Sequence, residues 1–330
     1  MIVITLIALA AGAASALMFV SLVAAFGSIA GVMIALLLFC LAPLPLMVAA
    51  LGWGAIAATI GGIAAASSLG VVLGLPACIA FVIMVALPAW WLGHLALLGR
   101  PIPTAGSHNG ATQAAPALEW YPVGRILLWI AGFAVLIAIA AILTLGTDAE
   151  TITGTLRQGI LSMIRARDPA SSADVERWVD AFVIIMPASV VIVFMATLTL
   201  NLWLAAKITA TSGRLHRPWP SLTGAELPPM TLAALSAAMA FCFVGGLLAI
   251  FAQIVTTALM MAYAIIGFAV LHTLTLAMKS RGIWLICTYV VVAMFTWPLL
   301  AMMALGIADT IFRLRQSYLQ RTRPPPLPAS

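Results

Sequence analysis

The sequence predicts an all-α fold, a polytopic transmembrane helical bundle, from two features of its composition. Hydrophobic residues make up 64% of the chain and charged residues only 7%, against about 45–50% and about 25% in soluble globular proteins. Residues 1–99 contain no Asp, Glu, Lys or Arg. A soluble fold of this length could not cover its surface with so few charges, so we expect the bilayer to be the solvent.

The uncharged block at 1–99 is expected to hold four membrane helices, because about 20 apolar residues cross about 30 Å of hydrocarbon. Glycine-containing breaks near residues 27, 53 and 75 divide the block into four helices. They are expected at 2–25, 29–50, 54–73 and 76–98. The apolar start at Met1 is typical of a retained first helix rather than of a cleaved signal peptide.

The rest of the chain is expected to add four or five helices. A cytoplasmic loop at 100–122 precedes a second membrane block at 123–318, and a disordered Pro-rich tail covers 319–330. Its helices are expected at 123–146, at 181–207, twice within Leu227–Met278 and at 283–308, with an inner loop at 208–229. Pro298 either breaks the last segment into a re-entrant pair or lies in a ninth crossing. The predicted number of membrane helices is therefore eight or nine.

Charged residues concentrate in the outer loop at 147–180. Ile152, Leu156 and Ile160 recur at helical spacing while Arg157 lies on another face, which is typical of an amphipathic helix in the membrane interface. The run Ser171-Ser172-Ala173-Asp174 resembles a capping box, and a helix is expected to run from it into 181–207. The loop is interpreted as an interfacial brace or, alternatively, as a lid over an outward-facing site.

The basic residues favour a cytoplasmic N-terminus. In that orientation the inner loops hold seven Lys and Arg residues and the outer loop four. A ninth crossing would place four tail arginines outside and reverse the balance to seven against eight, so the side of the tail stays open. The formal net charge of +6 then reflects loops that face lipid headgroups rather than a nucleic-acid-binding stripe. We therefore expect membrane lipids, and no nucleic acid, as partners.

Small residues recur at every fourth position of the third expected helix, and a weaker series lies in the first. Spacing of four keeps them near one face, where another helix can approach closely. The face serves either internal packing or docking of a membrane-protein partner. The residues are Gly54, Ala58, Gly62, Ala66 and Gly70, with Ala10 and Ala14 in the first helix.

The second expected helix contains Pro43 and Pro45 in its middle. Each proline removes a backbone donor, so the carbonyls of Phe39, Cys40 and Leu41 need other partners inside a membrane. Asn201 is the deepest amide side chain available to line a pocket there. The pair is interpreted as a ligand site between helices two and six or, alternatively, as an architectural kink.

No nucleophile–base set, phosphate loop or metal-binding motif is present in the sequence. The four cysteines are isolated and have no histidine at zinc-ligand spacing, so we expect no metal, no cofactor and no enzymatic activity. No acid lies in an expected membrane helix apart from Asp309 at the end of the last one. Because self-powered proton coupling usually needs such residues, their lack points to a partner that supplies energy. Gln253 is expected at the turn between helices seven and eight.

The order of several short motifs resembles the YybS-like family of bacterial multi-pass membrane proteins. They are Pro43-Leu44-Pro45, Leu87-Pro88-Ala89-Trp90-Trp91, Glu119-Trp120-Tyr121-Pro122, Pro187, Gly306-Ile307-Ala308-Asp309 and Phe312-Arg313-Leu314-Arg315. The resemblance implies a bacterial inner-membrane location. The family has been compared with the substrate-binding subunits of energy-coupling-factor vitamin transporters, which dock by small residues on helix one. No vitamin-binding position can be transferred to this chain.

These observations favour a solute-binding or transport-related membrane subunit for a neutral or amphipathic small molecule, powered by a partner. The alternative is a structural or assembly factor that binds other membrane proteins. A polar cavity between helices two and six would favour the first function. A packed bundle with an exposed small-residue face would favour the second.

Overall fold

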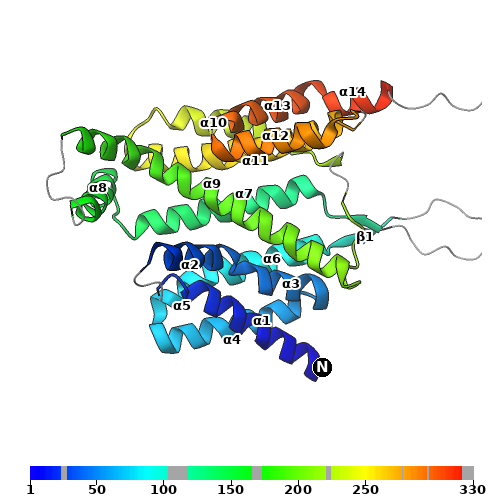
Figure 1. Cartoon of the computed structure of the whole chain (residues 1–330), viewed down its shortest axis with the longest axis horizontal. Helices are drawn as coiled ribbons and strands as arrows, with labels where there is room; N and C mark the ends of the chain where they lie inside the picture. The colour runs from blue at the N-terminus through cyan, green and yellow to red at the C-terminus, as the bar shows by residue number, and fades with distance from the viewer. Residues whose placement is uncertain are drawn as a thin grey trace, which may run out of the picture. The chain divides into compact units, whose positions relative to one another are not determined.

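The computed structural model describes residues 1–23, 28–102, 118–165, 173–220, 224–276, 278–295 and 297–321. They are mostly helical, with one two-stranded hairpin (Figure 1). Within these ranges, seven helices are long and apolar enough to cross a membrane, and three apolar helices are shorter. The all-α fold class is confirmed, whereas the predicted count of eight or nine crossings is not.

The chain divides into two compact units that are not contiguous in sequence. Unit 1 comprises residues 1–122 and 193–220, and unit 2 comprises residues 123–192 and 221–330. The 39-residue helix α9, Ala173–Thr211, contributes to both units and contains Pro187 in its interior. Its start confirms that the segment after residue 172 runs directly into the sixth expected helix. Ser171 and Ser172 lie outside the described residues.

Unit 1 contains the helices of the uncharged block. They are α1 (Ile2–Val20), α2 (Ile29–Leu41), α3 (Pro43–Trp53), α4 (Ala55–Leu73), α5 (Leu75–Phe81), the π-helix η1 (Val82–Ala86) and α6 (Leu87–Ala96). Gly54 and Gly74 separate successive helices with φ angles of +91° and +89°, a region that L residues with a side chain rarely adopt. The breaks predicted at these two glycines are confirmed.

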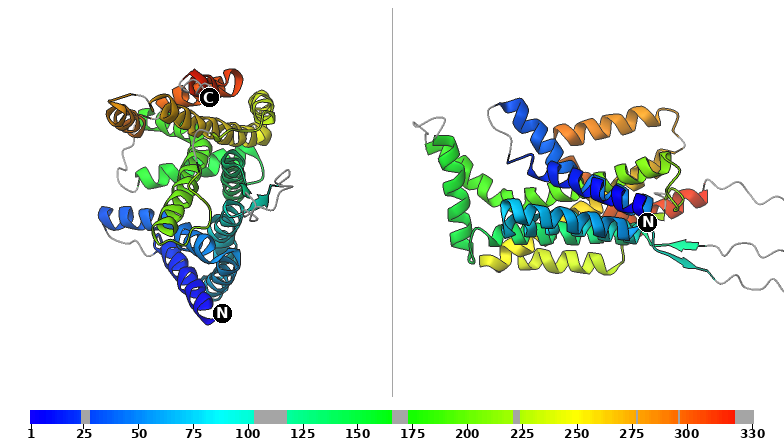
Figure 2. Two further views of the ribbon diagram at one scale, coloured as in Figure 1. Left: turned by 90° about the vertical axis from the view of Figure 1, so that its right-hand side faces the viewer. Right: turned by 90° about the horizontal axis from the view of Figure 1, so that it is seen from below.

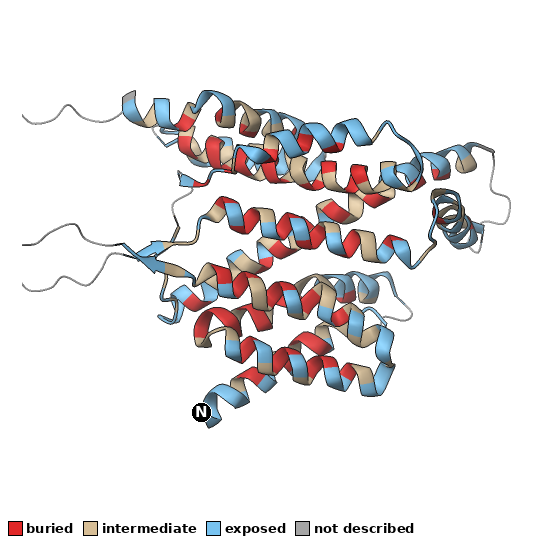
Figure 3. Cartoon of the chain, turned by 180° about the vertical axis from the view of Figure 1, so that it is seen from behind, coloured by how far each residue is buried: buried red, intermediate tan, exposed pale blue. Residues whose placement is uncertain are grey.

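Helices α1 and α4 of unit 1 pack against each other, and buried and exposed residues alternate along the helices (Figure 3). A Cβ atom added to Gly12 would overlap the carbonyl oxygen of Gly61, and one added to Gly61 would overlap the carbonyl oxygen of Ala8. Ala8 also forms a buried cluster with Ala49 and Ala57. Small residues therefore hold α1, α3 and α4 together within unit 1.

Two short strands follow α6 where the sequence predicted only a polar loop. Strands β1 (Gly99–Pro101) and β2 (Leu118–Trp120) are antiparallel, with Arg100 opposite Glu119. The two side chains form an exposed ion pair of 3.0 Å. The loop between the strands lies outside the described residues.

Unit 2 is built around the long helix α11, against which α7, α10 and α13 pack. A Cβ atom at Gly267 would overlap the carbonyl oxygen of Met302, and one at Gly306 would overlap that of Tyr263, so α11 and α13 cross in close contact. Besides residues of α9, the helices are α7 (Val123–Leu143), α8 (Ala149–Arg165), α10 (Met230–Phe241), α11 (Gly246–Leu274), α12 (Arg281–Met294), α13 (Pro298–Phe312) and α14 (Leu314–Arg321).

The prediction that Gln253 lies at the turn between helices seven and eight is wrong. The turn falls at Gly245 and Gly246, whose φ angles are +85° and +65°. Gln253 lies inside α11 and donates from Nε2 to the carbonyl oxygen of Ile184 at 3.2 Å. The glycine pair therefore leaves α10 with only 12 residues, fewer than the about 20 that a crossing requires.

Pro298 breaks the last apolar segment, as one of the two predicted alternatives required. It occupies the first turn of α13, and α12 ends four residues earlier at Met294. These helices have 14 and 15 residues, so each is shorter than a normal membrane crossing. Helix α14 continues to Arg321, so residues 319–321 of the predicted tail are helical, and residues 322–330 lie outside the described part.

A buried ion pair joins the last two helices. Arg315 and Asp309 are only 2% and 6% exposed, and Arg315 Nη2 lies 2.7 Å from Asp309 Oδ2. Arg315 Nε donates to the same oxygen at 2.8 Å, its backbone N–H donates to Oδ1 at 3.0 Å, and Nη2 donates to the carbonyl oxygen of Ala225 at 2.8 Å. Asp309, the acid expected at the end of a membrane helix, thus anchors α14 through Arg315, and Arg315 also holds the segment before α10.

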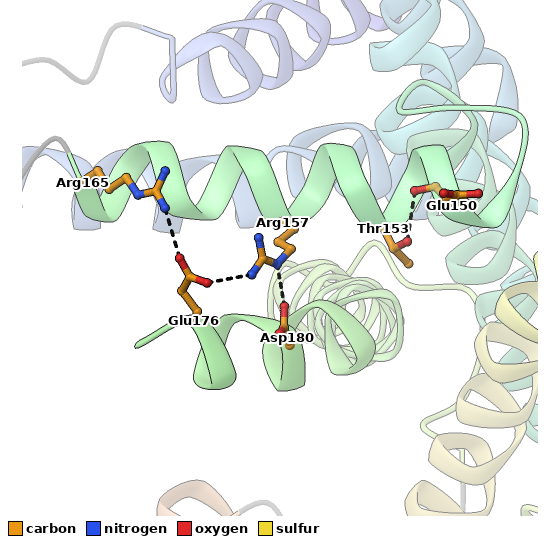
Figure 4. Close-up of polar contacts among 6 residues, drawn as sticks. All are labelled: Glu150, Thr153, Arg157, Arg165, Glu176 and Asp180. Carbon is orange, nitrogen blue, oxygen red and sulfur yellow. Dashed lines mark hydrogen bonds and ion pairs between the residues drawn. The ribbon is translucent and has the colours of Figure 1, made fainter. Parts of the chain in front are cut away.

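The amphipathic helix predicted between residues 147 and 180 is present as α8, whereas its side of the membrane stays a prediction. It runs across the direction of its neighbours in unit 2 (Figure 2), and its apolar side chain Leu161 packs against Val179 and Val183 of α9. Ion pairs join the same two helices: Arg157 bonds Glu176 and Asp180 at 3.2 and 2.7 Å, and Arg165 bonds Glu176 at 3.2 Å (Figure 4). These contacts support the interpretation of α8 as a brace.

Replacing Asp148 with alanine should fray the start of α8. Asp148 Oδ1 accepts the backbone N–H of Thr151 at 2.8 Å and Oδ2 accepts its hydroxyl at 2.7 Å, a side-chain cap of the helix. The Thr151 hydrogen bonds lower the pKa of Asp148, so its stabilising effect is present at neutral pH and is lost as the pH falls through that lowered pKa. Faster amide hydrogen exchange at Thr151 to Thr155 would verify this. Unchanged exchange would contradict it.

Candidate functional site

The break between α2 and α3 is the centre of the candidate site. Ala42 separates the two helices, and Pro43 occupies the first turn of α3. In a regular α-helix the carbonyl oxygen of Phe39 would accept the N–H of residue 43, but Pro43 has no N–H. The oxygen instead accepts the N–H of Ala42 at 3.1 Å, which tightens the turn. The helix is therefore distorted at the proline pair rather than opened by a full turn as predicted, because Ala42 keeps helical φ and ψ angles of −55° and −34°.

Asn201 of α9 closes the break from a distant part of the sequence. Its Nδ2 donates to the carbonyl oxygen of Cys40 at 2.8 Å and to that of Thr197 at 2.7 Å. Two carbonyl acceptors fix the orientation of the amide, because only its NH₂ group can donate to both. The side chain is 1% exposed, and its Oδ1 atom has no hydrogen-bond partner among the described residues.

A cavity of about 90 Å³ adjoins this contact within unit 1. Its lining is almost wholly apolar and comes from three segments: the α2–α3 break, the π-helix η1 and the middle of α9. The lining residues are Leu36, Phe39, Cys40, Pro43, Met84, Val85, Val193, Phe194, Thr197 and Leu198. Leu36 and Val193 are 45% and 53% exposed, so the cavity reaches the surface of the helices.

The π-helix on one wall of the cavity has an identifiable cause. Pro88 cannot donate a backbone hydrogen bond, and its ring would clash with the carbonyl of Met84 four residues earlier. Widening the turn over Val82–Ala86 relieves that clash while the helix continues. Single π turns inside α-helices are frequent at functional sites.

Three phenylalanines support the wall on the side of α1 and α5. Phe19 lies 5.6 Å from Phe39 and 5.4 Å from Phe81 between ring centroids, the latter in an edge-to-face arrangement. Phe81 is fully buried. Because such aromatic pairs add attraction beyond burial alone, they fix the position of Phe39 beside the cavity.

The structure brings together most of the residues expected at the site. Phe39, Cys40 and Pro43 line the cavity, and Asn201 is bonded to Cys40. Leu41 and Pro45 are half-buried beside the break but do not line the cavity. Sequence reasoning missed Met84 and Val85, although Pro88 was the signal for a distorted turn at that position.

The small-residue series is divided between interior and surface. Ala58, Gly62 and Ala66 are buried, Gly54 and Gly70 are half-buried, and Gly54 lies in a turn rather than a helix. In α1, Ala10 is exposed and Ala14 half-buried, whereas Ala8 and Gly12 carry the close contact. The buried members serve internal packing, one of the two predicted roles.

A larger hollow of about 490 Å³ lies between the C-terminal halves of α1 and α4. Its only hydroxyl, that of Ser68, is already bonded to the carbonyl oxygen of Ala65 at 2.8 Å. The hydroxyl proton of Ser68 is therefore already donated, and the rest of the lining is apolar.

No group of three His, Cys, Asp or Glu side chains that could hold a metal ion occurs in the described ranges. Comparison of the chain with protein-family models, curated proteins and solved structures found no match. The resemblance to the YybS-like family stays a prediction from the sequence. The candidate site therefore rests on its own geometry.

Proposed function

We propose that this chain is a multi-pass membrane protein that binds a small amphipathic molecule beside the α2–α3 break, as a solute-binding or transport-related subunit. The observation that carries the proposal is the buried Oδ1 atom of Asn201, which has no hydrogen-bond partner among the described residues, while the Nδ2 atom of the same amide bonds Cys40 in the wall of a cavity. Broken helices are a recurrent way of building solute sites at membrane depth. A bacterial inner-membrane location with a cytoplasmic N-terminus is part of the proposal.

The chemistry of the cavity limits the solute. Its apolar lining suits a hydrocarbon group, and a hydroxyl or amide donor on the solute would complete the hydrogen bonding of Asn201. A volume of about 90 Å³ holds roughly three water molecules at about 30 Å³ each, whereas ligand pockets are commonly about 300–1,000 Å³. The cavity therefore takes one end of a solute, which enters past Leu36 and Val193 from the bilayer.

One further observation favours solute binding over an assembly role, and another bears on the energy source. Ala58, Gly62 and Ala66 are buried within unit 1, so this part of the series offers no free docking face. Asp309, the acid expected in a membrane helix, is neutralised by Arg315. Because this carboxylate is held in an ion pair, we propose that a partner supplies any energy for transport.

A series of 1-alkanols tests the site, because each has an apolar tail and one O–H donor. In the purified full-length protein, short 1-alkanols should raise the thermal midpoint more than the matching n-alkanes, since a ligand that binds only the folded state stabilises it. Asn201→Leu should remove the preference for alkanols, and Val85→Phe should remove stabilisation by both. Val71→Phe, at an 88% exposed position, is the control and should behave as the wild type.

Equal stabilisation by alkanols and alkanes in the wild type would contradict the proposal. Asn201→Leu also leaves the carbonyl of Cys40 unpaired, which costs about 1–3 kcal/mol. The midpoint of each variant is therefore compared with and without ligand rather than with the wild type. Native mass spectrometry of the wild type identifies a co-purifying solute independently of any variant.

A further inference from the structure

One end of unit 1 places basic side chains over tryptophan rings. Lys207 Nζ lies 4.9 Å from the ring centroid of Trp219, and Arg214 Cζ lies 4.6 Å from that of Trp53. The two pairs come from the ends of different helices, since α3 ends at Trp53 and α9 ends at Thr211. Cation–π attraction holds each charged group in place without neutralising its charge.

Arg217 organises the segment that carries these pairs. Its Nη1 donates to the carbonyl oxygen of Ala96 at 3.1 Å and its Nη2 to that of Tyr121 at 3.0 Å. Its guanidinium also lies over the ring of Trp120, 5.9 Å from the centroid. Arg217 thus ties the segment after α9 to the end of α6 and to the hairpin.

The charges of unit 1 are confined to this end. Its sequence contains four Lys and Arg residues and a single acid, Glu119, and Glu119 is paired with Arg100. Lys207 and Arg214 have no carboxylate partner among the described residues, and both are exposed. The sequence segments 21–28 and 73–76, which follow the opposite ends of α1 and α4, contain no charged residue.

We propose that Lys207 and Arg214, framed by Trp219 and Trp53, bind the phosphate headgroups of anionic phospholipids. Tryptophan is enriched at the level of the headgroups, and lysine and arginine next to membrane helices attract anionic lipids. The positive charges of Lys207 and Arg214 have no carboxylate partner among the described residues, so they complement the negative charge of the lipid phosphates. The proposal rests on membrane insertion but not on the solute site.

The test uses the full-length protein in bilayers of neutral phosphatidylcholine with increasing phosphatidylglycerol. The thermal midpoint should rise with the anionic fraction, and added salt should reduce the rise because it screens the charges. The double variant Lys207→Gln/Arg214→Gln should lose most of this dependence. The control Arg100→Gln/Arg177→Gln removes the same charge from exposed residues that already have acidic partners. The thermal midpoint of this control should still depend on the anionic lipid fraction.

Equal loss in both double variants would overturn the proposal, because it would reflect net charge alone. Inorganic phosphate that produces the same rise in neutral bilayers would also overturn it, by assigning the site to a free anion. If the first double variant does not fold, Lys207→Arg/Arg214→Lys keeps the charges and should retain the dependence. Native mass spectrometry of the wild type should show phosphatidylglycerol retained over phosphatidylcholine, and equal retention would contradict the assignment.

Discussion

Replacing Arg315 with methionine should lower the free energy of unfolding by about 3–5 kcal/mol, because a buried carboxylate left without its partner is strongly destabilising. Asp309 is 6% exposed and receives three hydrogen bonds from the backbone and side chain of Arg315. The change also removes the bond from Arg315 to the carbonyl of Ala225. Reversible unfolding in mixed micelles measures the difference.

Two controls separate the buried pair from charge in general. Arg100→Met breaks an ion pair whose side chains are 82% and 57% exposed, and should cost about 0–1 kcal/mol. The double variant Asp309→Leu/Arg315→Met should be less damaging than Arg315→Met alone, because it leaves no unpaired charge. If Arg315→Met were as mild as Arg100→Met, the ion pair would not anchor α14.

An alanine at Gly61 should destabilise unit 1 far more than an alanine at the neighbouring Gly62. The new Cβ atom at position 61 would overlap the backbone carbonyl of Ala8, which cannot rotate away, whereas at position 62 it would lie 3.4 Å from the side chain of Ala86. Overpacking costs about 1–3 kcal/mol even where side chains can adjust. Folded yield and thermal midpoint of the two variants provide the measurement.

Gly132→Ala in α7 is the matched control, since a Cβ atom there meets no atom within 4 Å. It makes the same chemical change in a helix and should be neutral or slightly stabilising, because alanine favours helix more than glycine. Equal effects at positions 61 and 62 would show that α1 and α4 tolerate separation, and would remove the argument for a backbone contact.

The contact between Asn201 and Cys40 could be predicted from the sequence because carbonyls without a donor and polar side chains that could pair with them are both rare in this chain's apolar helices. Prolines deprive one stretch of a membrane helix of donors, and few side chains at that depth can replace them. Because so few donors are available, Asn201 could be identified as the partner of Cys40 although the two residues are 161 positions apart in the sequence. The hypothesis of a ligand there is a separate matter, which the alkanol series addresses.

Other features could not be predicted because several arrangements satisfy the same pattern. Gly61 and Gly62 are adjacent, so a small-residue series with period four does not say which of them meets the neighbouring backbone. Uniform hydrophobicity from Leu227 to Met278 likewise gives no boundary, and the glycine pair at 245–246 was the one local signal of the turn.

The π-helix η1 has a consequence for the cavity beside it. A π turn accommodates about one residue more than an α turn, so a change of Val82–Ala86 to α geometry would rotate one side of the helix by about 100° relative to the other. Met84 and Val85 would then face a different direction, and the cavity wall that they form would be rebuilt while the helix stays folded. The volume available to a solute is therefore coupled to the register of a single helical turn.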